Sequence, residues 1–83
     1  MNGSAKLSII IPVYNEKNTI LKLLKLVESV RLPIEKEIIL VDDNSTDGTR
    51  QVLQTLDPSR YVINLREKNG GKGAALKDGL RLA

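Results

Sequence analysis

Short apolar runs alternate along the chain with longer segments of mixed polarity. Residues 7–13, 38–41 and 61–65 are rich in Ile, Val and Leu and are bounded by polar, charged or proline positions. Runs of this length that are apolar at nearly every position are typical of strands buried on both faces of a parallel sheet. We therefore predict three strands at these residues.

The segments that follow each strand have the periodicity of amphipathic helices. Apolar residues recur there at the 3.6-residue spacing that places them on one face of a helix. We predict helices at residues 18–30, 46–56 and 74–83. The apolar residues of the first helix are Ile20, Leu23, Leu24, Val27 and Val30, and those expected to face inward are Val52, Leu53 and Leu56 in the second helix and Leu76, Leu80 and Ala83 in the third.

The order of these elements, strand then helix repeated three times, predicts an α/β fold in three layers. Right-handed crossover connections place the strands in one parallel sheet and the helices on its two faces. The strand-to-helix turns, at residues 12–16, 42–47 and 66–72, then lie at the carboxyl edge of the sheet, where open parallel sheets bind ligands. The three turns are therefore expected to form one site.

The second turn delivers two adjacent carboxylates, Asp42 and Asp43, from the end of a buried strand. Desolvating paired acids is costly unless a partner binds them. A carboxylate can accept paired hydrogen bonds from the amide or imide edge of a nucleobase, or from two ribose hydroxyls. The alternative is structural: residues 43–45 form an Asx turn, and Thr46 or Asp47 caps the next helix.

The other two turns contain residues suited to the rest of a nucleotide. Tyr14 offers a ring for a base and Glu16 is favoured near a helix start, although a half-buried tyrosine and a capping acid explain the same residues. Arg66 and Lys72 flank glycines before a helix, and exposed backbone N–H groups beside a lysine suit a phosphate. The glycine spacing matches neither a P-loop nor a dinucleotide-binding motif, so a flexible connector is the alternative.

Composition narrows the classes of function. The 83 residues allow one small domain, and the absence of cysteine and histidine removes disulfides, thiolate metal sites and the commonest general base. The net charge of +3 comes with only two aromatic residues, both tyrosine, so nucleic-acid binding is disfavoured. No apolar stretch approaches the roughly 20 residues of a membrane span, and residues 1–6 lack the apolar core of a secretory signal. A cytoplasmic location is therefore expected.

Three motifs, in order along the chain, carry a resemblance to a known family. They read IIIPVYNE at residues 9–16, VDDNSTDGT at 41–49 and NGGKGAA at 69–75. The chain resembles family 2 glycosyltransferases of the GT-A fold, and among them the dolichol-phosphate and undecaprenyl-phosphate sugar transferases. For residues 7–83 this implies the N-terminal, nucleotide-sugar-binding half of a Rossmann-like GT-A domain, preceded by a polar extension at residues 1–6.

The resemblance implies a pocket for a UDP- or GDP-sugar. Such enzymes transfer the sugar to a lipid phosphate or a glycan, as in cell envelope polysaccharide biosynthesis, and Mg²⁺ or Mn²⁺ neutralises the nucleoside diphosphate that leaves. A polyprenyl phosphate acceptor places the full-length enzyme at the cytoplasmic face of the membrane. The residues implied for the nucleotide are Pro12, Tyr14 and Glu16 around the base and ribose, Asp43 with Asp42 beside it at the base or ribose, and Lys72 near the base or diphosphate.

The chain departs from the family in its acidic residues. The family's metal-binding Asp-x-Asp motif does not occur among its ten Asp and Glu residues, and the family's catalytic base lies further along. We assign no catalytic and no metal-binding residue here, and expect the chain to be inactive by itself, with the metal ligands elsewhere in a longer enzyme. Two alternatives stay open: a nucleotide- or phosphate-binding α/β module without catalytic activity, and a purely structural or oligomerising fragment.

The first strand carries one further expectation. In the family fold this strand is interior, flanked by the second strand and by one supplied downstream. Without that neighbour, residues 8–13 form an unpaired apolar edge, and such edges pair with other chains. We therefore predict self-association through the first strand, or a poorly soluble product.

Overall fold

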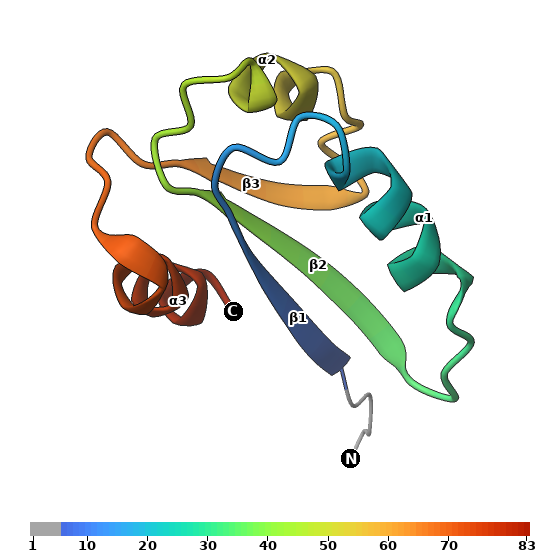
Figure 1. Cartoon of the computed structure of the whole chain (residues 1–83). Coiled ribbons are helices and arrows are strands. Elements are labelled where there is room, and N and C mark those ends of the chain that lie inside the picture. Colours follow the sequence, from blue (N-terminus) through green and yellow to red (C-terminus); the bar gives the residue numbers. More distant parts are fainter. Residues whose placement is uncertain (1–5) are drawn as a thin grey trace.

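The computed structural model describes residues 6–83, which form one three-stranded sheet with helices on both faces (Figure 1). The strands are ordered β1-β2-β3, so β2 is central, and both neighbouring pairs are parallel. The predicted α/β fold is therefore confirmed. The elements are β1 (Lys6–Val13), α1 (Ile20–Ser29), β2 (Glu35–Asp42), α2 (Thr49–Gln54), β3 (Tyr61–Leu65) and α3 (Gly71–Leu82).

The alternation of side chains along β2 divides the core into two layers. Ile38 and Leu40 pack on the face covered by α1 and α2, whereas Ile39 and Val41 pack on the face covered by α3 (Figure 1). All four side chains are at most 4% exposed. Burial on both faces explains why the central strand is apolar at each of these successive positions.

Helix α3 approaches the sheet through small residues and not through its leucines. Its buried residues are Ala75 and Gly79, whereas Leu76 and Leu80 are 41% and 67% exposed. A Cβ atom on Gly79 would lie 2.3 Å from a side-chain carbon of β1, so the helix backbone lies directly against that strand. The predicted inward face, made of Leu76, Leu80 and Ala83, is therefore wrong, because a leucine does not fit into so close a contact.

The bounds of the elements also differ from prediction, most of all at the starts of β2, α2 and α3, and α3 begins at Gly71 where residue 74 was predicted. β2 begins at Glu35, three residues before its predicted start, because Lys6 of β1 pairs with Glu35 and extends the ladder. α2 begins at Thr49 and not at residue 46, since Gly48 before it has a φ of +100°, which no helix accommodates. No helix within residues 6–83 has both the length and the apolar character needed to cross a membrane.

Candidate functional site

The three strand-to-helix turns meet at the carboxyl edge of the sheet. The register places Val13 opposite Asp42 and Asp42 opposite Leu65, so the three strands end level with one another. A cavity of about 350 Å³, a volume typical of small-ligand sites, lies between the turns. Its walls are formed by Pro12, Val13, Tyr14 and Glu16 from the first turn, Asp43 from the second, and Asn69, Gly71, Lys72 and Ala75 from the third turn and α3.

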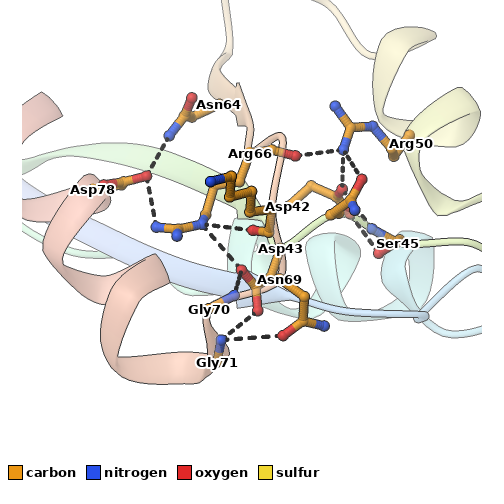
Figure 2. A network of polar contacts seen from close by, with 12 residues as sticks. Asp42, Asp43, Ser45, Arg50, Asn64, Arg66, Asn69, Gly70, Gly71 and Asp78 are labelled. Atoms are coloured by element: carbon orange, nitrogen blue, oxygen red, sulfur yellow. Dashed lines mark hydrogen bonds and ion pairs between the residues drawn. The ribbon is translucent and has the colours of Figure 1, made fainter.

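Of the six residues that the resemblance assigns to a nucleotide, five line this cavity, and Asp42 does not. Asp42 is completely buried, and its carboxylate accepts hydrogen bonds from the backbone N–H and the hydroxyl of Ser45, at 3.0 and 2.5 Å (Figure 2). Nη1 of Arg50 lies 3.4 Å from the same carboxylate. Asp42 therefore closes the second turn by accepting the N–H of the residue three positions on, and its charge is compensated inside the chain. The Asx turn expected at residues 43–45 does not form, because the N–H of Ser45 donates to Asp42 and not to Asp43.

Asp43 holds the glycine-rich third turn in place. Its Oδ1 accepts the N–H of Gly70 at 3.0 Å and lies 3.0 Å from Nε of Arg66, while its Oδ2 accepts the N–H of Gly71 at 2.8 Å (Figure 2). These donors offset the desolvation of a residue that is only 4% exposed. Because Oδ2 accepts a single bond among the described residues, it keeps acceptor capacity for a group bound in the cavity.

Arg66 connects the third turn to α3. Its guanidinium bridges Asp43 and Asp78, with Nη1 at 2.9 Å from the Asp78 carboxylate, and its side chain is only 17% exposed. A Cβ atom on Gly70 would lie 2.7 Å from Nη2 of Arg66, so glycine leaves the room that the guanidinium occupies. Arg66 is thus held by ion pairs within the fold, and Lys72 is the positively charged residue of this turn that lines the cavity.

Side chains of the second turn and of the first residue of α2 hydrogen-bond to the backbone of the first turn. The N–H of Asn15 donates to Oγ of Ser45 at 2.9 Å, and the N–H of Glu16 donates to Oγ1 of Thr49 at 3.0 Å. In the other direction, Oδ1 of Asn15 accepts the N–H of Thr46 at 2.8 Å. Sequence reasoning missed these links, although Asn15 offered a signal: asparagine tolerates the left-handed backbone, and its φ is +51°.

Asp47 joins the start of α2 to the first turn. Its carboxylate accepts the N–H groups of Thr49 and Lys17, at 3.0 and 3.3 Å, and also the hydroxyl of Thr49. The hydroxyl of Thr49 is the largest cause that lowers the pKa of Asp47 below its ordinary value. The N-cap position is Gly48, so neither Thr46 nor Asp47 is the cap residue, and Asp47 anchors the helix start from one residue before the cap.

The cavity combines an aromatic ring, acceptor oxygens and a cation. Tyr14 is 47% exposed, and Glu16 and Lys72 are exposed as well. Lys72 takes part in none of the ion pairs found within residues 6–83. This arrangement suits a ligand that carries a planar group, hydroxyls and a negative charge.

The two adjacent acids do not form a metal site. Asp42 lies against Arg50 and Asp43 against Arg66, so each carboxylate already has a cationic partner. Within residues 6–83, no group of three or more acidic side chains is placed to hold a metal ion. A Mg²⁺ or Mn²⁺ ion requires several oxygen ligands, and the described residues do not supply such a set.

Comparison with known proteins gives one family and several relatives. Residues 8–83 match the model of glycosyl transferase family 2. The undecaprenyl-phosphate 4-deoxy-4-formamido-L-arabinose transferase of Pseudomonas fluorescens (strain SBW25) is 40% identical over 77 residues, which cover 87% of this chain and 23% of that protein. The poly(ribitol-phosphate) beta-glucosyltransferase of Bacillus spizizenii is 37% identical over 83 residues, covering 94% of this chain and 13% of that protein. The chain thus spans less than a quarter of the length of these two relatives.

Proposed function

Because the chain belongs to glycosyl transferase family 2, we propose that its cavity binds the nucleotide part of a UDP- or GDP-sugar. The observation that carries this proposal is the convergence of Tyr14, Asp43 and Lys72, from three separate turns, on one cavity of about 350 Å³. Family membership supports glycosyl transfer in general. The cavity chemistry supports a donor that has a base, a ribose and a diphosphate.

In this proposal, the residues from each turn contact a different part of the nucleotide. The half-exposed ring of Tyr14 packs against the base, and Oδ2 of Asp43 accepts a hydrogen bond from the base or from a ribose hydroxyl. The carboxylate of Glu16 meets the ribose, beside Pro12. The ammonium of Lys72 is attracted to the diphosphate as a compact, mobile charge.

The acceptor and the site of action are part of the same proposal. The name of the Pseudomonas fluorescens relative supports a polyprenyl phosphate acceptor, used by a longer enzyme at the cytoplasmic face of a membrane. A Mg²⁺ or Mn²⁺ ion in that enzyme would neutralise the charge of the departing diphosphate, and residues 6–83 contain no set of side chains placed to hold it. The residues of this chain bind and orient the nucleotide.

Calorimetric titration of the chain with UDP and GDP tests the proposal. We expect one nucleotide to bind, and the Tyr14→Ala and Lys72→Ala variants each to weaken binding by about tenfold, which corresponds to about 1.4 kcal/mol. Lys77→Ala is the matched control, because Lys77 is an exposed lysine of α3 outside the cavity. A folded sample that binds neither nucleotide contradicts the proposal. Pyrophosphate binding as tight as that of UDP favours a phosphate-binding module instead.

A further inference from the structure

The carboxylate of Asp43 has an acceptor position left on one of its two oxygens. A carboxylate offers about four lone-pair positions, two on each oxygen. Oδ1 already receives the N–H of Gly70 and Nε of Arg66, both at 3.0 Å, so its two positions are used. Among the described residues, Oδ2 receives only the N–H of Gly71, at 2.8 Å. The acceptor that remains for a ligand is therefore on Oδ2.

Asn69 lies beside this acceptor and also lines the cavity. Its Oδ1 accepts the same N–H of Gly71, at 3.2 Å, so the side chains of Asn69 and Asp43 converge on one backbone donor (Figure 2). The oxygen and nitrogen ends of an amide are assigned from their hydrogen bonds. Because the oxygen end faces the N–H of Gly71, the NH₂ end of Asn69 is turned away from it, and the side chain is exposed.

The structural role of Asn69 accounts for its oxygen and not for its NH₂ group. An oxygen that accepts the N–H two residues on closes an Asx turn, and an aspartate closes such a turn as well as an asparagine. None of the hydrogen bonds found within residues 6–83 uses the NH₂ group of Asn69. The turn therefore leaves an amide donor at the wall of the cavity.

Together, Oδ2 of Asp43 and the NH₂ group of Asn69 form an acceptor and a donor side by side. Their complement is an N–H next to a C=O. Uracil and guanine have this pair, because a ring N–H in the middle of the base edge lies next to a ring C=O. Cytosine and adenine have a bare ring nitrogen in the middle of that edge, and its lone pair would face the carboxylate of Asp43.

We propose that Asn69 is a specificity-determining residue of the nucleotide site. Its NH₂ group donates to the ring C=O of uracil or guanine, next to the ring N–H that Asp43 accepts. This inference rests on the proposed function, in which the ribose and the diphosphate are held elsewhere in the cavity and fix the position of the base edge. Asp43 is 4% exposed and bound by three donors, so its carboxylate is not free to turn toward a different base.

Calorimetric titration of the wild-type chain with UDP and CDP tests the proposal without any substitution. The two nucleotides share the ribose and the diphosphate and differ only at the base edge. We expect UDP to bind at least about tenfold more tightly than CDP, because a site that hydrogen-bonds an N–H group discriminates strongly against an analogue that lacks it. GDP is compared with ADP in the same way if guanine is the base that the cavity binds.

The variant Asn69→Asp removes the donor and keeps the turn. It retains an oxygen for the N–H of Gly71 but replaces the NH₂ group by a second oxygen. We expect the ratio of UDP to CDP affinity to fall by about tenfold, because the C=O of uracil then faces a carboxylate and the amino group of cytosine gains an acceptor. The added negative charge acts on both diphosphates alike, so it cancels in the ratio. Asn18→Asp is the matched control, since Asn18 is an exposed asparagine outside the cavity.

The outcomes separate this inference from the proposed function. If CDP binds the wild-type chain as tightly as UDP, or ADP as tightly as GDP, the role of Asn69 is overturned while nucleotide binding stands. The role is also overturned if Asn69→Asp leaves the affinity ratio unchanged, or if Asn18→Asp lowers it as much. A chain that binds none of the four nucleotides contradicts the proposed function and this inference together.

Discussion

Gly79 of α3 offers a sharp test of how closely the helix lies against β1. A Cβ atom there would lie 2.3 Å from Cγ2 of Ile10, and this methyl group is attached directly to the stiff, β-branched Cβ atom, so it has little freedom to move away. Overpacking of this kind costs up to about 3 kcal/mol. Replacing a helical glycine by alanine raises the free energy of unfolding by about 1 kcal/mol through helix propensity. We therefore expect Gly79→Ala to lower the free energy of unfolding by about 2 kcal/mol.

Urea unfolding followed by far-ultraviolet circular dichroism measures this change. Gly73→Ala is the matched control, because Gly73 lies in the same helix and a Cβ atom there has no neighbour within 4 Å. The same substitution is expected to raise stability there by about 0.5–1 kcal/mol. Opposite signs at the two glycines are the signature of a steric contact, since helix propensity alone gives the same sign at both.

The double variant Gly79→Ala/Ile10→Ala separates the contact from other effects. With the Ile10 side chain truncated, the added methyl group has room, so the alanine at residue 79 costs less than it does in the wild-type background. A coupling energy of about 1–2 kcal/mol is expected. If Gly79→Ala stabilises the chain as Gly73→Ala does, or if the coupling is zero, the close approach of α3 to β1 is refuted.

Two further substitutions test the polar links of the site. Asp42→Ala is expected to lower the free energy of unfolding by about 3 kcal/mol, because it leaves Arg50 without its buried partner, and an almost neutral result in urea unfolding contradicts this role. A carboxyl group whose pKa is lower in the folded than in the unfolded state stabilises the fold above its unfolded pKa and loses that contribution as the pH falls through its folded pKa. The pKa of Asp47 is lowered, chiefly by the Thr49 hydroxyl. We therefore expect Asp47→Asn to flatten the loss of stability below about pH 4, and unchanged acid unfolding curves refute this.

The sequence predicted the order and the type of every element because each strand is apolar enough to be recognised without its neighbours. The face of α3 was not predictable in the same way. Leu76 and Leu80 are the more hydrophobic choice, yet Ala75 and Gly79 are buried. Hydrophobicity ranks side chains by transfer energy, whereas the burial of Gly79 depends on how closely two backbones approach, which is a property of the packed structure.

Within the site, the sequence predicted which turns converge but not which of two adjacent acids faces the cavity. Successive side chains of a strand point to opposite sides, so Asp42, the last residue of β2, and Asp43 after it are not equivalent. The alternation of side-chain direction along the strand indicated that one of the two acids lies inside the fold. Choosing between them required the positions of Arg50 and Arg66, both of which come from other elements.

The turns around the cavity are ordered by contacts within the chain. Within residues 6–83, no buried side-chain nitrogen or oxygen lacks a hydrogen-bond partner, so the turns around the cavity are held in place before any ligand arrives. A ligand then meets an ordered wall and does not have to order the turns.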